Sequence, residues 1–255
     1  MQSVHARIVL LIAATVLSSC ASLAADARQK LVMLIAEHEY ETATTLPEFA
    51  ARHLANHFRV VTVTGSLAPG ESAFDGLEAI ADADVLLVSV RRRTPPKAQL
   101  DAIRRHVTAG KPVVGIRTAS HAFSLLRNQT LAAGNADWPQ FDAEVIGGNY
   151  TNHHGKGPAI RVTASGATAA KHPILKGVRL PFESEYSLYK NTPLRPGAQS
   201  LLTGEIPGKD PEPVAWVFTR RDGGRTFYTS LGGPTDFKND SFVNLLRNGI
   251  LWAAK

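Results

Sequence analysis

The amino-acid sequence predicts an α/β fold with a mostly parallel sheet and helices on both faces. In the first half of the chain, apolar runs of strand length alternate with helical patterns, which is the order that βαβ units produce. Strands buried on both faces are nearly continuous apolar runs, as at 84–90 and 112–117. Small and polar residues follow 112–117 directly, where a tight turn would lead from strand to helix.

Each element of the first half has its own signal. Helix 46–57 has Leu46, Phe49, Ala50 and Leu54 at helical spacing, and Pro47 suits its first turn. A later helix begins after Pro96 and ends at Gly110. A short helix at 77–81 and a helix-like pattern at 122–126 complete the set. The predicted strands are 30–36, 59–64, 84–90 and 112–117.

The second half divides into an irregular stretch and a regular end. Residues 128–210 are rich in Gly, Pro, Asn and His, and they are too many for a structureless loop in a compact domain. We therefore expect one domain over 26–255, with an elaborated insertion at about 128–210 that carries function. Regular structure returns as strands at 213–218 and 225–231, a hairpin turn at 222–224, and a helix at 241–254.

Residues 1–25 have the pattern of a secretory leader. His5 and Arg7 precede an apolar run at 8–17 that is too short to span a bilayer. Leu17 to Cys20 resembles a bacterial lipobox, which would make Cys20 the lipidated first residue of an exported protein. The alternative is ordinary cleavage after Ala24, which would leave a soluble periplasmic or secreted protein. With a single Cys in the chain, no intrachain disulfide can form.

Charge excludes one class of partner. The formal net charge is +6, and removing the leader with its one Arg gives 6 − 1, or about +5. Basic residues are scattered apart from 91–93 and 220–221, with no basic arm and no basic patch interleaved with aromatics. We therefore expect no nucleic-acid partner, and contact with a membrane only through a lipid anchor. The sequence leaves the oligomeric state open.

One turn is similar in shape to a known catalytic turn. Gly115-Ile116-Arg117, followed by His121, resembles the nucleophile turn of class I glutamine amidotransferases. In those enzymes the catalytic Cys stands where this chain has Arg117. Because Cys20 in the leader is the only Cys, a cysteine-dependent amidotransferase or protease is excluded.

A wider set of motifs lies at 117–123, 138–142, 146–150, 172–177, 183–186, 225–232 and 248–252. In this order the motifs resemble the ThuA-like (trehalose utilisation) family of the same superfamily. The resemblance implies a flavodoxin-like fold and a link to carbohydrate uptake and breakdown, through oxidised (keto) sugars. Many members have Gly-Leu-His at 115–117 and Ser-Leu-Gly-His at 230–233. This chain has Arg117 and Gly233 in place of the two histidines.

Candidate site residues follow the predicted parallel strands, whose carboxyl ends meet at one edge. Glu37 and Glu39 flank His38 after the first strand, and the alternative for them is a solvated acidic loop. Arg91 follows the third strand, where one arginine is expected to face the site and another to pair with the acidic loop. Arg117 and His121 follow the central strand, although His121 could instead bond to backbone at a helix start.

The insertion supplies the remaining candidates. Asn149, Tyr150, His153 and His154 have no packing pattern and are interpreted as sugar-binding or proton-transfer groups. With His38 or His121, the paired histidines could instead bind a divalent metal; no cofactor is certain. Glu185 and Tyr186 would supply a carboxylate and an aromatic platform, and the alternative is a surface strand that pairs with arginines.

These residues predict a single pocket and leave three function classes. The catalytic candidates are Glu37, His121, His153 and Glu185, and the binding candidates are Glu39, Arg91, Arg117, Asn149, Tyr150, His154 and Tyr186. The first class is an enzyme that acts on sugars or keto-glycosides by acid/base chemistry. The second is a non-catalytic sugar-binding lipoprotein, and the third is a scaffold or interaction module of the cell envelope.

Overall fold

The structure is a computed structural model, and it describes residues 27–66, 68, 70–155 and 157–255. The expected leader with Cys20 lies outside these residues. One ten-stranded sheet dominates the fold, with the order β3-β2-β1-β4-β5-β12-β11-β10-β7-β8. Its parallel core consists of β2 (Phe58–Gly65), β1 (Gln29–Ala36), β4 (Val85–Val90), β5 (Val113–Ile116) and β12 (Arg225–Thr229).

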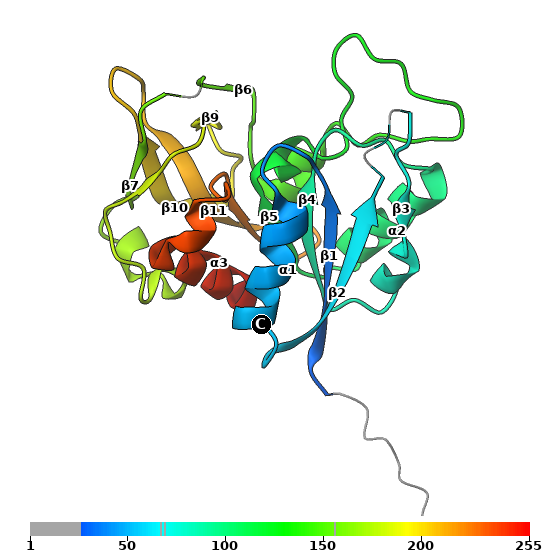
Figure 1. Ribbon diagram of the computed structural model, residues 1–255, viewed down its shortest axis with the longest axis horizontal. Coiled ribbons are helices and arrows are strands. Elements are labelled where there is room, and N and C mark those ends of the chain that lie inside the picture. The colour runs from blue at the N-terminus through cyan, green and yellow to red at the C-terminus, as the bar shows by residue number, and fades with distance from the viewer. Residues whose placement is uncertain (1–26, 67, 69, 156) are drawn as a thin grey trace, which may run out of the picture.

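Helices cover both faces of this sheet, as the sequence predicts (Figure 1). Side chains of β1 alternate, so Leu31, Met33 and Ile35 belong to one buried cluster and Val32 and Leu34 to the other. The first cluster packs under α1 (Thr42–His53) and α3 (Asp240–Ala253). The second packs under α2 (Lys97–Thr108) and the 3₁₀ helix η1 (Leu77–Ile80). The α/β prediction is confirmed.

The stretch 128–210 contains more regular structure than its composition predicts. Three of its strands extend the main sheet in antiparallel fashion beyond β11 (Glu212–Thr219). These strands are β10 (Ala198–Glu205), β7 (Ile160–Ala164) and β8 (Phe182–Ser184). Their periodicity is weak in the sequence because β7 and β8 are short and β10 is interrupted by a bulge.

The rest of that stretch is made of short elements. They are a π-helical turn η3 (Asp142–Ile146), the 3₁₀ turns η4 (Ala169–Lys171) and η5 (Pro173–Leu175), and a two-stranded ribbon of β6 (Asn152–His153) and β9 (Tyr189–Lys190). A two-residue strand β3 (Phe74–Asp75) and the turn η6 (Asp236–Lys238) complete the fold.

The prediction of a helix at 122–126 is wrong. A 3₁₀ helix, η2 (Arg117–His121), follows β5, and irregular turns follow η2. Ala122 and Phe123 are fully buried, so their apolar character reflects packing into the core beneath the turn and not one face of a helix.

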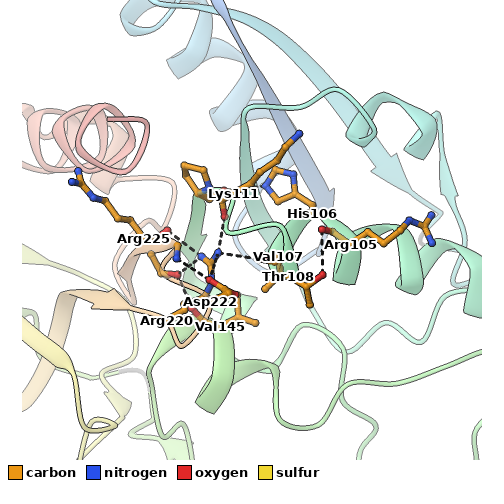
Figure 2. Close-up of polar contacts among 12 residues, drawn as sticks. Arg105, His106, Val107, Thr108, Lys111, Val145, Arg220, Asp222 and Arg225 are labelled. Atoms are coloured by element: carbon orange, nitrogen blue, oxygen red, sulfur yellow. Dashed lines mark hydrogen bonds and ion pairs between the residues drawn. The ribbon is translucent and has the colours of Figure 1, made fainter.

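At the amino edge of the sheet, Arg220 ties the β11–β12 hairpin to the turn between α2 and β5 (Figure 2). Its Nε donates to Asp222 Oδ2 at 3.2 Å. The two Nη atoms donate to groups of β12 and of the α2–β5 turn, namely Arg225 O, Thr226 Oγ1, Val107 O and Lys111 O. All five N–H donors of a guanidinium can therefore be used. Gly224 makes the arrangement possible, because a Cβ there would lie 1.9 Å from Nη2.

Candidate functional site

The carboxyl edge of the parallel core carries unusual backbone geometry. In the described part of the chain, the non-glycine residues with positive φ are Glu41 (54°), Arg92 (49°) and Arg117 (48°). They lie in the loops that follow β1, β4 and β5, so all three are at the same edge. Such conformations are unfavourable by about 1–3 kcal/mol each and gather at functional sites. The strained backbone therefore indicates this edge as the place to look for a functional site.

Arg117, at the turn after β5, is a fully buried cation held by aromatic rings. Its guanidinium carbon lies 4.0 Å from the ring centroid of Tyr40 and 4.6 Å from that of Tyr189. It donates to the carbonyls of Ser230 and Ser187 and, at 3.4 Å, to Ser187 Oγ. Nε has no partner, and no carboxylate in the described residues forms an ion pair with Arg117. Cation–π contacts thus replace a counter-ion.

Tyr186 completes this aromatic cage and explains one of the replaced family histidines. Its ring centroid lies 5.8 Å from the guanidinium of Arg117 and 5.9 Å from the ring of Tyr40. A Cβ at Gly233 would lie only 2.0 Å from the Tyr186 ring. The ring therefore occupies the space that a side chain at position 233 would need. Tyr186 was predicted as an aromatic platform for a ligand, and in the structure its ring packs against Arg117 instead.

A cavity of about 550 Å³ opens over this edge, within the size range of small-molecule sites. A neighbouring cavity of about 310 Å³ shares Arg92, His121, Tyr150 and Thr151 with it. The larger one is lined by polar and aromatic side chains, which include Glu39, Tyr40, Arg91, Arg92, His121, Tyr150, His153, Ser187 and Tyr189. The smaller one adds Ser120, Asp142 and Asn149.

A slightly larger cavity, of about 590 Å³, lies between η1 and α2. Alanine and aliphatic side chains form just over half of its walls, and the others are Glu78, Gln99, Arg105, His106 and Lys111. None of the strained backbone positions lines it. A ligand site combines an apolar wall with convergent polar groups, which are richer at the carboxyl edge. We therefore place the candidate site at the carboxyl edge.

His121 forms the floor of the site as a neutral imidazole. Its ring stacks on Tyr150 with centroids 4.5 Å apart, and Nδ1 lies 3.2 Å from Ser120 Oγ. Burial, and then the nearby charges of Arg92 and Arg91, lower the pKa of His121 from 6.5 to about 3. At neutral pH the ring therefore carries no charge and can donate or accept one hydrogen bond.

Tyr150 and His153 form a hydrogen-bonded pair at the mouth of the site. The Tyr150 hydroxyl lies 3.0 Å from Nδ1 of His153. Burial raises the pKa of Tyr150, whereas His153 is exposed to solvent. The Tyr189 ring lies beneath both, with its centroid 4.8 Å from that of Tyr150 and 6.0 Å from that of His153.

Several predicted site residues lie together here, but Glu37 has a different environment from the one expected. Its buried carboxylate accepts hydrogen bonds from the backbone N–H groups of Glu39, Tyr40 and Thr42 and from the Thr42 hydroxyl. It shapes the loop after β1 and does not line either cavity. Glu39 does line the larger cavity, where it forms an ion pair with Arg91 at 2.9 Å.

Four further residues of the predicted pocket line neither cavity. Arg117 and Tyr186 pack on each other beside the site, and His154 and Glu185 lie outside it. His154 does not line the site, since it follows the short strand β6, and its charged neighbours are Lys190, Lys209, Glu212 and Asp210. Glu185 is exposed and lines no described cavity. β8 ends at Ser184, so the strand that was to orient Glu185 toward the pocket stops before it.

The sequence reasoning missed four residues of the site, namely Tyr40, Arg92, Asp142 and Tyr189. Tyr40 is adjacent to the predicted residue Glu39 and Tyr189 lies three residues after Tyr186, but neither stands at a recognisable spacing. Asp142 accepts from the Tyr150 N–H at 2.6 Å, and burial raises its pKa from 3.8 to about 7. Asp142 is the last residue of the 138–142 motif, and that motif is the sequence feature that could have marked it as a site residue.

Neither a metal cluster nor a membrane-spanning helix is found in the described residues. No three His, Cys, Asp or Glu side chains there are grouped as metal ligands, so the alternative of a metal held by His153 and His154 with His38 or His121 finds no such group. Across the same residues, no helix has both the length and the apolar composition needed to cross a bilayer.

Fold and site together define an α/β protein of the flavodoxin-like type, with a strained turn after the central strand and no cysteine at that turn. The chain belongs to the ThuA family, described as trehalose utilisation, whose model matches residues 31–253. Arg117 and Gly233 thus stand where the resemblance to this family leads one to expect histidines.

Comparison with solved structures supports the fold. A ThuA-like protein from Bacteroides uniformis ATCC 8492 is 18% identical, with a TM-score of 0.62, over 89% of this chain and 91% of that one. A ThuA-like protein from Parabacteroides merdae ATCC 43184 is 15% identical, with a TM-score of 0.60, over 89% and 90%. A β-galactosidase from Rahnella sp. R3 is 13% identical, with a TM-score of 0.55, over 86% of this chain and 31% of that one. The search of curated proteins gave no match.

Proposed function

We propose that this protein acts on sugars or keto-glycosides by acid/base chemistry, with Tyr150 and His153 as its proton carriers. The hydrogen bond between the Tyr150 hydroxyl and Nδ1 of His153, at 3.0 Å over the cavity, is the observation that carries the proposal. A proton carrier must reach both the substrate and the solvent. Tyr150 lines both cavities and His153 is exposed, so the pair meets both requirements.

The chemistry assigned to the pair is a two-step proton relay. A substrate proton passes to the Tyr150 oxygen while the phenolic proton passes to Nδ1 of His153. His153 then returns its proton to water or to the leaving group. His121, held neutral, lines both cavities and is assigned to hydrogen-bond a substrate oxygen, as a neutral imidazole can beside a carbonyl.

The walls of the cavity suit a carbohydrate. Tyr150 is partly exposed and lines both cavities, so its ring offers apolar surface to the C–H groups of a sugar. Aromatic rings supply large contact area at low entropic cost. Glu39 and Asn149 bear acceptor and donor atoms for hydroxyl groups. The family's link to trehalose utilisation agrees with this choice of substrate class.

A second candidate function is sugar binding without turnover. The observation in its favour is the loss of two expected carboxylate proton carriers, because Glu37 is engaged by backbone N–H groups and Glu185 lies outside the cavity. The remaining carboxylate of the larger cavity, Glu39, is paired with Arg91.

The test is the pair of variants His153→Ala and His154→Ala, assayed on disaccharides and their keto derivatives. The two histidines are neighbours in sequence, and only His153 lines the cavity, so His154→Ala is the matched control. We expect His153→Ala to lower turnover by about 100-fold or more and His154→Ala to leave it unchanged. Ligand-induced melting shifts report binding separately. Equal turnover in both variants would refute the relay, and binding without any turnover in the parent protein would favour the second candidate.

Export is also part of this proposal. The pattern at 1–25 supports cleavage of a leader, and Cys20 supports attachment of a lipid after cleavage. In a bacterial host, the parent chain should incorporate labelled fatty acid and fractionate with membranes, and Cys20→Ala should do neither. Labelling that persists in Cys20→Ala, or cytoplasmic retention of the parent chain, would contradict it.

A further inference from the structure

We infer that the carbohydrate is acidic, and that its carboxylate or phosphate binds the guanidinium of Arg92 between the two cavities. This inference rests on the proposed function and narrows its substrate class. Arg92 lines both cavities, so an anion bound there would leave the sugar ring free to lie against Tyr150.

The charges around the cavities are not balanced. Arg91 and Arg92 line the larger cavity, and Arg117 lies behind its wall. The carboxylate of Glu39 is the one acidic group among the described residues that line it, and Glu39 pairs with Arg91 at 2.9 Å. His121 adds no charge at neutral pH because its pKa is lowered to about 3. Arg92 is left without a carboxylate partner in the described chain.

The smaller cavity does not supply the missing partner. Its one carboxylate, that of Asp142, accepts from the Tyr150 N–H and forms no ion pair in the described structure. Burial raises the pKa of Asp142 to about 7, so much of its population is uncharged near neutral pH. The charge of Glu39 is felt at Arg92, but no carboxylate of the described residues forms an ion pair with the Arg92 guanidinium.

The geometry of Arg92 holds its guanidinium in place before a ligand arrives. Its backbone has a φ of 49°, and its N–H donates to the His121 carbonyl at 3.1 Å. Nη1 donates to Ser124 Oγ and to the Leu125 carbonyl, each at 3.3 Å. For Nε and Nη2 the structure gives no hydrogen bond within the described residues. A guanidinium fixed at one end, with free donors at the other, matches the two oxygens of a carboxylate or phosphate.

Partial burial makes an anion favourable at this position. Burial, as the largest cause, lowers the pKa of Arg92, which means that its positive charge is partly desolvated. A strained backbone conformation beside a partly buried, unpaired cation would be unfavourable in a purely structural loop. An anionic ligand would offset the cost of the desolvated positive charge when it binds.

Arg93 provides a matched control within the same loop. Its guanidinium is also partly buried, which lowers its pKa. Nη1 of Arg93 donates to the Glu71 carbonyl at 2.8 Å, and Arg93 lines neither cavity of the site. Changing Arg93 removes the same charge from the same loop without touching the site.

The experiment is calorimetric titration of the full mature chain and of Arg92→Gln and Arg93→Gln with matched ligand pairs. The neutral probes are glucose, galactose and lactose; the acidic probes are glucuronate, galacturonate, lactobionate and glucose 6-phosphate. Acetate and inorganic phosphate test for binding of the anion alone. Comparing glucuronate with glucose 6-phosphate distinguishes a carboxylate site from a phosphate site, and melting curves without ligand confirm that both variants fold.

We expect at least one acidic sugar to bind about tenfold or more tightly than its neutral counterpart, as one charge-assisted contact permits. Arg92→Gln should abolish that preference, Arg93→Gln should keep it, and added salt should weaken acidic binding alone. Neutral sugars that bind as tightly as acidic ones would overturn the inference and leave the proposed function intact. An acid preference that persists in Arg92→Gln would refute the assigned residue. Binding of acetate and phosphate without any sugar would refute the carbohydrate in both proposals.

Discussion

Two buried arginines at opposite edges of one sheet show how the same residue can serve different purposes. Arg220 at the amino edge donates to a carboxylate, three carbonyls and a hydroxyl. Arg117 at the carboxyl edge has three donated bonds, an unpaired Nε and aromatic rings in place of a counter-ion. Its backbone φ is 48°, a strained value for a residue with a side chain.

From this difference we propose that the amino edge mainly stabilises the fold and that the carboxyl edge binds the ligand. A fully paired buried cation ties segments together, and its loss exposes many unsatisfied groups. Arg117 lies fully buried behind the cavity wall, where it holds Tyr40 and Tyr189 in the positions that shape that wall. Each arginine also depends on one glycine, Gly224 below Arg220 and Gly233 beneath Tyr186. Four predictions test this contrast, in order of their expected effect on the free energy of unfolding.

Arg220→Met should give the largest effect, a loss of about 3 kcal/mol or more in the free energy of unfolding. The apolar side chain would leave Asp222 and four further acceptors without their donor. Urea or guanidinium denaturation of the variant and the parent measures the loss. A loss below about 1 kcal/mol would show that Arg220 does not tie the amino edge together.

Gly233→Ala should lower the free energy of unfolding by about 1–3 kcal/mol, the usual range for overpacking. The new methyl group would lie 2.0 Å from the Tyr186 ring, so the ring must move away from Arg117. In Gly233→Ala combined with Tyr186→Ala, the two losses should be less than additive. Additive losses in this double-mutant cycle would contradict the contact.

The free energy of unfolding should decrease in acid because of one buried histidine at each edge of the sheet. These are His121 at the carboxyl edge and His106 at the amino edge. Burial, as the main cause, lowers the pKa of His121 from 6.5 to about 3 and that of His106 to about 4. Below pH 6.5 the unfolded chain therefore takes up protons that the native state refuses, so stability decreases from pH 6.5 toward 3 and toward 4 respectively.

The variants His121→Gln and His106→Gln measure these contributions. Between pH 7 and 5, each should lose about 1–2 kcal/mol less stability than the parent, by 1.36 kcal/mol per unit of pKa difference. Denaturation curves at the two pH values give the comparison. If a variant loses as much as the parent, its histidine is not held neutral in the folded state.

Arg117→Met should have the smallest effect on the free energy of unfolding, about 1 kcal/mol. An apolar group in the tyrosine cage avoids the desolvation of a buried cation, which offsets the lost hydrogen bonds. Its effect on ligand binding should nevertheless be large, because the cage forms one wall of the cavity. Denaturation and calorimetric titration of the same sample check both parts, and a stability loss equal to that of Arg220→Met would remove the contrast.

The sequence predicts the parallel core well because β1, β4 and β5 are buried on both faces and read as apolar runs. It also predicts which loops meet, since parallel strands deliver their carboxyl ends to one edge. It does not predict which side chains of a loop line the cavity and which ones stabilise the loop itself. Glu37 and Glu39 are two residues apart, yet one caps the loop and the other lines the cavity.

The antiparallel extension was harder to predict because its strands have no clear pattern of buried and exposed residues. Its strands alternate weakly, so the end of β8 at Ser184, which removes Glu185 from the site, leaves no mark in the pattern. His153 and His154 are likewise equivalent in sequence and are distinguished only by the two-residue ribbon that β6 forms with β9. The contribution of Tyr40 and Tyr189 depends on packing against Arg117.

Hydrogen exchange with and without ligand tests most directly the claim that the carboxyl edge is the binding edge. The ligand is the sugar of the panel that binds the parent chain most tightly. Slower amide exchange is expected at 37–41, 91–93, 117–121 and 150–153, with no change at 105–111 and 220–225. Protection confined to 77–81 and 98–111, along the cavity between η1 and α2, would contradict the account.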